Sequence, residues 1–456
     1  MDNSNTHFGK SNTFEEPMAS VDHAWLRMDT AVNPMVINAV MTLKSPVSDS
    51  LFRDRVFSKF ASIARFQCRP NAGMLGDYWQ PTTIDQDYHL PIENQLVDSD
   101  IELQQIATEF MNRPLDRTRP LWRMLFIPRF MQGSAVIIRI HHAYADGMAL
   151  MKVLLQMMDE GELIKQFDRR KTTSDSILKP QGWLNKLQPF LPGNGRWIET
   201  LQLVEELSTE LVKLGLSPGE ENVFKSPGLC GKKQLIWTAP LKLDEVKTIA
   251  HAHSAKVNDV LVSSVAGAFR RYLKSINQLS SWSELRTLIP VDLRSHIKAK
   301  DLGNYFGLVF LSMPLGIEDP IERAKILNQR MTALKTSKQA WLVFQLLQLS
   351  GYLPDIAEKE LIRLFSSKAS AVMTNVPGPS FPLHFNGSEL DQILFWVPQS
   401  GSIGVGVSIL TYNNRVQFGL MTDQQLIQSP ESIIDCFNTE FESLLLETLM
   451  TVNWPT

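Results

Sequence analysis

The sequence predicts a mixed α/β (α+β) protein made of two halves that are joined by a helical connector. Runs rich in Val and Ile at 35–43 and 135–140 are typical of strands, and an apolar helical pattern follows at 148–160. The same mixture of strand and helix patterns returns from residue 234 onward. A polar, charged stretch at 168–176 separates the two regions and is typical of a linker.

The same sequence patterns predict the later helices and strands. Apolar residues recur three and four positions apart over 197–214, which predicts an amphipathic helix that ends at Gly215 and Pro218. The second half opens with the strand-like "KQLIWTAPL" and the helix-like "LDEVKTIAHAH". It closes with the strand-like runs "IGVGVSIL" and "RVQFGLM", which the turn "TYNN" separates.

The length of 456 residues exceeds one compact domain, since a domain averages roughly 150 residues. We therefore expect a flexible polar tail at 1–16, an N-terminal domain at 17–167, a linker with its connecting helix at 168–233, and a C-terminal domain at 234–456.

Composition excludes several classes of protein. The formal net charge is −3, so no overall basic field favours binding to nucleic acid. The three cysteines, Cys68, Cys230 and Cys436, lie far apart without metal-ligand spacing, which is typical of a reduced, cytoplasmic protein without a disulfide framework. The polar N-terminus lacks the apolar core of a signal peptide, and we find no apolar run of the ~18 residues that a transmembrane helix needs.

The stretch "VIIRIHHAYADGMAL" at 136–150 is the candidate for chemistry. Successive strand residues point to opposite faces, so His141 and His142 cannot both face one cavity if the strand runs through them. Histidine suits proton transfer because its ordinary pKa of ~6.5 lies near neutrality. Asp146 can cap the helix that follows or pair with a cation, and Gly147 permits a tight turn. The alternative interpretation is that both histidines are structural and Asp146 is only a helix cap.

Here the sequence resembles a known family. "HHAYADG" looks like the HHxxxDG motif of the CoA-dependent acyltransferase superfamily, and the chain is similar to the bacterial wax ester synthase/diacylglycerol acyltransferase family. The resemblance covers about 17–450. It is carried by these further blocks, in chain order: "MASVDHAWLRMDTAVNPM" (18–35), "PLDRTRPLW" (114–122), "VND" (257–259), "DLGNYFG" (301–307), "TNVPGP" (374–379) and "ILTYNNRVQFGLMTD" (409–423).

The resemblance implies two chloramphenicol-acetyltransferase-like domains, each a mixed sheet flanked by helices, with the active site in a tunnel between them. It implies that His142 is the general base and that Asp146 is structural, paired with an arginine for which Arg69 and Arg294 are the candidates. Asn258 is a candidate for supporting the oxyanion. No GxSxG elbow occurs and no cysteine lies near the motif, so we expect direct transfer without an acyl-enzyme.

The family blocks also suggest substrate-binding residues. These are Pro120, Leu121, Trp122, Asp259, Asn304 and Asn375. Each block has a structural alternative: Asn258 as a helix cap, the "PLW" block as core packing, and "NVPGP" as a rigid turn. Asp292 and Thr374 depart from the family pattern, and we expect both to lie away from the chemistry.

The implied reaction moves a long-chain acyl group from acyl-CoA, a co-substrate, to a long-chain alcohol or to diacylglycerol, without a metal or another cofactor. Such substrates imply association with a membrane surface or lipid droplet. The apolar segment at 340–354 is either a buried helix or an interfacial one. Oligomeric state stays open, with a homodimer among the options. The competing functions are a condensation-domain-like acyltransferase with a carrier-bound donor, and a non-catalytic lipid-binding or droplet protein.

Overall fold

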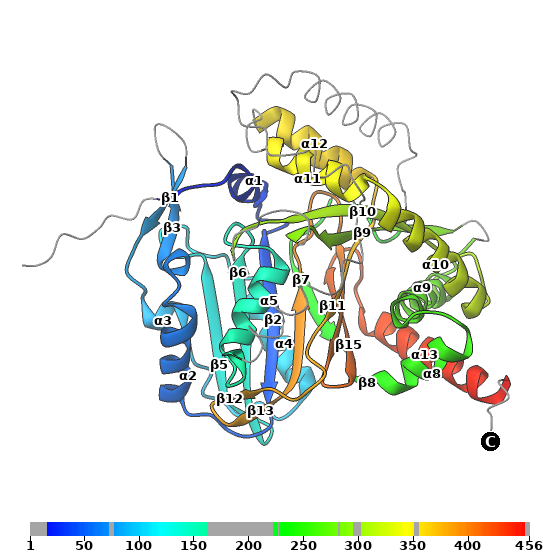
Figure 1. Cartoon of the computed structure of the whole chain (residues 1–456), viewed down its shortest axis with the longest axis horizontal. Helices are drawn as coiled ribbons and strands as arrows, with labels where there is room; N and C mark the ends of the chain where they lie inside the picture. The colour runs from blue at the N-terminus through cyan, green and yellow to red at the C-terminus, as the bar shows by residue number, and fades with distance from the viewer. Residues whose placement is uncertain are drawn as a thin grey trace, which may run out of the picture.

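The computed structural model describes residues 16–72, 77–162, 222–226, 228–280, 283–294, 302–350 and 355–451. Two large sheets lie next to each other, with helices packed around them (Figure 1). Nearly all of the predicted tail (1–16) and most of the predicted connecting segment (168–233), including its helix at 197–214, lie outside the described residues.

The first large sheet is antiparallel and carries the histidine motif. Its strands, in spatial order, are β12 (His384–Phe385), β13 (Ser388–Trp396), β2 (Val36–Leu43), β6 (Gly133–His141) and β5 (Trp122–Phe130). Every residue of β2 and β6 is buried, which agrees with the continuous Val and Ile runs that predicted these two strands.

The second large sheet is mixed, because β11 runs parallel to both of its neighbours while the other pairs are antiparallel. Its strands, in spatial order, are β10 (Phe306–Pro314), β9 (Glu284–Asp292), β11 (Ala371–Pro377), β14 (Val405–Tyr412), β15 (Arg415–Asp423) and β7 (Lys233–Trp237), with β8 (Leu241–Lys242) also paired to β15. Asn413 and Asn414 form the predicted turn, and both adopt positive φ, as a two-residue hairpin turn requires.

Helices cover the sheets on several sides. On the first half lie α1 (Ser20–Met28), α2 (Asp49–Arg55), α3 (Gln86–His89), α4 (Asp100–Met111) and α5 (Gly147–Gln156). On the second half lie α8 (Leu243–Ala252), α9 (Val257–Ser275), α10 (Pro320–Thr336), α11 (Gln339–Ser350), α12 (Asp355–Ser367) and α13 (Glu431–Thr451). A small sheet of β1 (Glu16–Pro17), β4 (Tyr78–Pro81) and β3 (Cys68–Asn71) completes the fold, with short helical turns at Val56–Phe60 and Ala64–Gln67.

The C-terminal segment contributes two strands to the first sheet. Strands β12 and β13 come from the segment predicted as the C-terminal domain, yet β13 pairs with β2 and so completes the first sheet. Phe385 and Phe395 from these strands belong to the same apolar core as Phe52 of α2. The predicted division at residue 234 stays a prediction, but sheet membership crosses it, so we expect the halves to fold as one cooperative unit.

The helix predicted within 340–354 is α11, and residues 351–354 lie outside the described part. The helix packs on β10 and α1, and Leu342, Val343 and Leu346 are buried, which favours the buried-helix alternative. Leu349 at its end is 46% exposed. Among the helices that the structure describes, none combines the length and the apolar character needed to cross a bilayer.

Candidate active site

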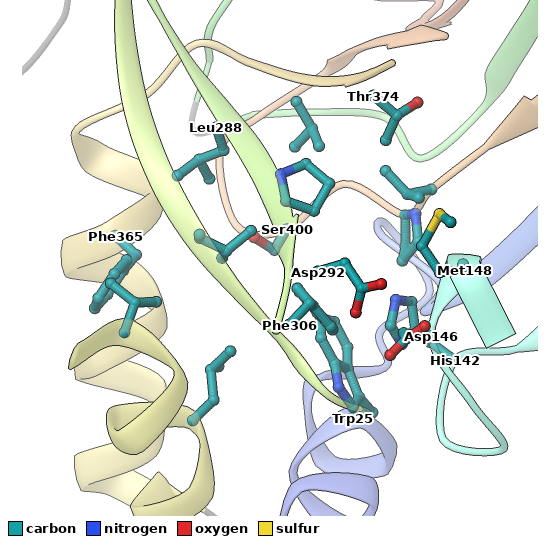
Figure 2. A pocket seen from close by; sticks show the side chains of 18 of the residues that line it. Trp25, His142, Asp146, Met148, Leu288, Asp292, Phe306, Phe365, Thr374 and Ser400 are labelled. Atoms are coloured by element: carbon teal, nitrogen blue, oxygen red, sulfur yellow. The ribbon is translucent and has the colours of Figure 1, made fainter. Parts of the chain in front are cut away.

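The two adjacent histidines face different cavities. Strand β6 ends at His141, and His142 begins the turn that leads into α5. His142 lines a cavity of about 370 Å³, whereas His141 lines a second cavity of about 480 Å³. Figure 2 shows His142, Asp146 and Trp25 gathered at one end of the first cavity, which we call the His142 cavity. The alternation of strand residues predicted this separation.

The imidazole of His142 is held between aromatic rings. Only 3% of the residue is exposed, and its ring stacks on Trp25 with centroids 4.0 Å apart. The ring of Phe306 lies 5.6 Å away at a tilt. Burial lowers the pKa of His142 to about 4, although the charge of Asp146 acts in the opposite direction. The ring is therefore neutral at physiological pH and able to accept a proton.

The ring of His142 lines the cavity, while its backbone is anchored. Nδ1 is buried and has no hydrogen-bond partner in the described part of the chain. The backbone is fixed on both sides: the His142 amide donates to the Met35 carbonyl at 2.8 Å, and its carbonyl accepts from Nδ2 of Asn304 at 3.1 Å. These bonds fix where the ring can lie.

Asn304 links His142 to a buried carboxyl group. Its Nδ2 also donates to Oδ1 of Asp22 at 2.9 Å, so a single amide group joins α1 to the histidine turn. Burial raises the pKa of Asp22 to about 6, against the lowering effects of Asn304 and Arg65. We infer that Asn304 holds the histidine turn in place from the side away from the cavity, because it is buried and its contacts are with protein atoms.

Asp146 joins the two halves through its carboxylate. Its carboxylate accepts from both terminal nitrogens of Arg294, at 2.8 and 2.7 Å, from the Ala149 amide at 3.0 Å, and from the Tyr305 amide at 2.9 Å. Asp146 thus caps α5 and pairs with a cation at the same time. Of the two predicted partners, Arg294 is correct, whereas Arg69 bonds to Gln80 instead.

Gly147 follows directly and starts α5. A Cβ atom built on this residue would lie 2.9 Å from a ring carbon of Phe395, closer than real Cβ contacts occur. The absence of a side chain therefore lets β13 approach the start of α5 and close this side of the cavity.

His141 lies in a polar environment on the other side. Its Nδ1 accepts from the Ala143 amide at 3.1 Å, and Nε2 lies 3.7 Å from Oδ2 of Asp29. Burial alone would raise the pKa of Asp29, but interactions with His141 and Arg117 lower it to about 2. His141 thus belongs to an ion-paired cluster and lies away from the His142 cavity.

The His142 cavity is largely apolar and takes its walls from both halves. Its apolar lining comes from α1, α5, β9, β10, α11, α12 and β13, and includes Trp25, Met28, Met148, Leu288, Phe306, Leu308, Val343, Leu346, Leu347, Leu361, Ile362, Phe365 and Phe395. Asp292 and Thr374 also line it, which corrects our expectation that both lie away from the chemistry. They bring polar atoms to an otherwise apolar space.

Three predicted site residues do not reach this cavity. Asn258 is the second residue of α9, so it is not the helix cap, and its side chain accepts from Asn375, which does line the cavity. Asp259 binds the Lys256 amide at 3.0 Å and also Asn328, so it stabilises the start of α9. The role of Asn258 in supporting the oxyanion and the roles of Asp259 and Asn304 in substrate binding stay predictions, because none of the three is among the residues that line the cavity.

The "PLW" block is mainly core packing. Trp122 is fully buried and donates from Nε1 to the Phe66 carbonyl at 2.8 Å. The Pro120 carbonyl bonds to a ring nitrogen of His89 at 3.1 Å. Neither Pro120 nor Trp122 is among the residues that line the two cavities, whereas Leu121 lines the second, and their role in substrate binding stays a prediction. Strand β5 directs Trp122 into the core, and this direction could not be read from the block.

Two residues of the site were not identified from sequence patterns. Trp25 supplies the ring beneath His142, and Asp22 supplies the buried carboxyl group behind it. The segment 18–35 that contains them resembles the family's opening block, but the residues there gave no spacing that points to His142. A contact between segments more than a hundred positions apart has no signal in a single sequence.

Comparison with known proteins agrees with this arrangement. The model described as the wax ester synthase/diacylglycerol acyltransferase catalytic domain matches residues 18–261, and the WS/DGAT C-terminal domain matches 302–445. An "O-acyltransferase WSD" of Acinetobacter baylyi is 22% identical over 454 residues, covering 93% of this chain and 96% of the relative. A "probable diacylglycerol O-acyltransferase" of Mycobacterium tuberculosis is 25% identical over 334 residues, 72% of each chain.

Solved structures share the fold. A wax ester synthase/diacylglycerol acyltransferase from Marinobacter aquaeolei VT8 superposes with a TM-score of 0.68 at 19% identity, covering 95% of this chain and 99% of that one. The first condensation domain of a calcium-dependent antibiotic synthetase gives 0.60 at 11% identity, covering 95% and 96%. The predicted fold class is confirmed; the predicted tunnel stays a prediction.

We predict that Asp146→Ala lowers the free energy of unfolding by about 3–5 kcal/mol, because it removes the cap of α5 and leaves the buried Arg294 guanidinium with only the longer, 3.4 Å contact to Asp292. Urea denaturation followed by fluorescence measures the change. The control is Asp391→Ala, which breaks a partly exposed pair with Arg415 and should cost less than about 1 kcal/mol. Equal losses in the two variants would contradict the central role of the Asp146 pair.

Proposed function

Because the chain belongs to the wax ester synthase/diacylglycerol acyltransferase family and is an O-acyltransferase, we propose that it moves a long-chain acyl group from acyl-CoA to a long-chain alcohol or to diacylglycerol, with His142 as the general base. One observation carries this proposal. The imidazole of His142, which its lowered pKa keeps neutral, lines an apolar cavity whose walls come from both halves.

The shape and chemistry of the cavity suit a fatty substrate. Its lining is rich in Leu, Phe, Val and Met, and each methylene group buried there contributes about 0.8 kcal/mol to binding. Polar atoms gather near His142, where Asp146, Asp292 and Arg294 lie. A long chain would therefore lie toward Leu288 and Phe365, with the reacting carbonyl or hydroxyl group beside the histidine.

The proposed chemistry is direct transfer. Nε2 of His142 takes the proton from the acceptor hydroxyl as its oxygen attacks the thioester carbonyl carbon. The tetrahedral intermediate collapses, the carbon–sulfur bond breaks, and the imidazolium returns the proton to the departing thiolate. Both substrates are bound together, which supplies much of the rate enhancement. None of Cys68, Cys230 and Cys436 is among the residues that line the cavity.

We also propose that the enzyme works at a membrane or lipid-droplet surface. Helices α11 and α12 line the His142 cavity, and each carries an exposed apolar residue: Leu349 is 46% and Ile356 is 80% exposed. Apolar side chains at this position would bury in the boundary of a lipid surface. The apolar acceptors, a long-chain alcohol or diacylglycerol, would then pass from the lipid into the cavity without crossing water.

Thiol release tests the reaction. With palmitoyl-CoA and hexadecanol, we expect wild-type protein to release free CoA thiol only when the alcohol is present. His142→Ala should lose at least about a hundredfold in rate, because a positioned general base contributes roughly 10²–10⁴-fold. His141→Ala should retain most activity and lose stability, since His141 belongs to the Asp29 cluster.

The controls separate the alternatives. Circular dichroism and thermal melting show whether each variant is folded. A wild-type protein that releases no thiol with any acceptor would favour a lipid-binding protein. Acylation of the intact protein by palmitoyl-CoA without alcohol, seen as added mass, would contradict direct transfer.

The pH dependence follows from the lowered pKa of His142. Because the base works when unprotonated and its pKa is about 4, kcat/KM should stay level from pH ~7 down to pH ~5 and fall below pH ~4. Initial rates over this range, with circular dichroism at each pH, measure the profile. An inflection near ~6.5, the ordinary histidine value, would show that another histidine or a more solvated His142 controls the rate.

Vesicle flotation tests the lipid surface. Leu349→Glu/Ile356→Glu should reduce the bound fraction on phosphatidylcholine/phosphatidylglycerol vesicles several-fold, because two charges oppose burial in the lipid boundary. Ile101→Glu on α4 is the matched control, being exposed and apolar on another face. Met450→Glu, at the exposed end of α13, tests a competing surface. Loss of binding in Met450→Glu alone would assign the lipid contact to α13.

A further inference from the structure

The second cavity differs in chemistry from the His142 cavity. It measures about 480 Å³ and is lined by four cationic side chains: Arg113, Arg117, Arg139 and Lys233. One carboxylate, Asp29, lies among the described lining residues. We call this space the basic cavity.

Two of the four cations have counter-charges. Arg117 pairs with Asp29 at 2.8 Å. Nζ of Lys233 lies 3.6 Å from Oδ2 of Asp423 and 2.8 Å from Oδ1 of Asn33. These contacts offset the positive charges of Arg117 and Lys233. The charges of Arg113 and Arg139 still need an explanation.

Arg139 is a buried cation without a carboxylate partner. It is 1% exposed, and Nη1 donates to the carbonyls of Phe110 and Arg113 at the end of α4. Its Nε has no hydrogen-bond partner, and no carboxylate lies within ion-pair distance in the part of the chain that the structure describes. Burial, and then the charges of Arg123 and Arg113, lower the pKa of Arg139 to about 9.

Arg113 adds a second positive charge at the same place. It lines the basic cavity just after α4, is exposed, and forms no ion pair with any described residue. The buried charge of Arg139 is costly unless a ligand supplies the opposite charge, and the exposed Arg113 places a second guanidinium group at the same cavity. A concave space with two guanidinium groups suits an anion, and guanidinium groups favour phosphate in particular.

The basic cavity is a neighbour of the His142 cavity. Met28 lines one and Asp29 the other, and in the same way Ser400 lines one and Gln399 the other. Asn33 lies at this wall, where its Nδ2 donates to the Gly401 carbonyl at 2.7 Å. Consecutive residues therefore line the two cavities at two places, so the cavities share a boundary there.

We propose that the basic cavity binds the phosphate groups of the acyl donor, with Arg113 and Arg139 as their ligands, so that the nucleotide end of acyl-CoA lies on the His141 side. This inference rests on the proposed function, which requires a CoA thioester as donor. It assigns opposite approaches to the two substrates: the phosphorylated donor from the basic cavity, and the apolar acceptor from the side of α11 and α12.

A pair of donors isolates the phosphate contact. Palmitoyl-CoA carries the nucleotide phosphates, whereas the palmitoyl thioester of N-acetylcysteamine has the same reacting group without them. In Arg113→Ala, we expect kcat/KM to fall about tenfold or more with palmitoyl-CoA and to stay within about twofold with the short donor. Arg113→Lys should recover part of the loss, because it restores charge without the planar fork. Arg139→Gln should give the same selective loss.

The matched control lies on α12, a helix that lines the other cavity. Arg363 is an exposed arginine on α12, and Arg363→Ala should leave the ratio of the two donors unchanged. Equal losses with both donors in Arg113→Ala, no loss with either, or a CoA-selective loss in Arg363→Ala would each overturn the proposal.

Binding without turnover distinguishes this inference from the proposed function. Calorimetry with 3′,5′-ADP, the nucleotide end of CoA, should show binding by the wild type that weakens as salt rises and is lost in Arg113→Ala. If this binding is present but neither donor is turned over with any acceptor, the proposed function fails and the phosphate site stands. Absence of binding by the folded wild type would remove the phosphate site.

Discussion

The carboxylate of Asp146 is the point on which the rest of the structure depends. It receives four hydrogen bonds, two from Arg294 at the end of β9, one from the start of α5 and one from the Tyr305 amide. Burying both charges is costly, and the bonds offset this cost only while all four are formed. The same contact therefore closes the first half onto the second and sets the start of α5. It leaves the preceding residues, His142 among them, little freedom to move.

Because this turn is fixed, the directions of the His141 and His142 side chains decide which cavity each histidine lines. The end of β6 sends His141 and His142 to opposite sides, and each side has walls of a different kind. Helices α11 and α12 line the apolar cavity, whereas the end of α4 and the start of β7 line the basic cavity. The proposed reaction, between a fatty chain and a charged, phosphorylated carrier, would need both environments within reach of one base. Strand β13 joins the first sheet and brings Phe395 against Gly147, at the wall of the His142 cavity.

Much of the fold could be predicted from local pattern. β2, β6, α5 and β15 begin within two residues of the predicted starts, since continuous apolar runs and helical spacing are properties of short segments. The crossing of β13 into the first sheet could not be predicted, because pairing between strands hundreds of residues apart leaves no mark in either strand. The same holds within the site. The motif pointed to His142 and Asp146, and Arg294 was one of two candidate partners of Asp146, but Trp25 and Asp22 reach the histidine only through tertiary packing. The core position of Trp122 and the contact of Asp259 with the start of α9 could not be predicted, because side-chain directions there depend on elements that had not been placed.

The electrostatics around His142 constrain how a proton can pass through it. Burial lowers the pKa of His142 and raises that of Asp22, so the interior disfavours charge on both groups. The charge of Asp146 is already matched by Arg294, and that of Asp22 in part by Arg65. An imidazolium at this position therefore receives little stabilisation from the protein alone. In the reaction proposed above, it would be compensated by the negative charge that develops on the tetrahedral oxygen and then on the thiolate, both of which belong to the substrates. Under that proposal, proton transfer is coupled to bond making and breaking, because the ring would carry its proton only while the reacting atoms carry the opposite charge.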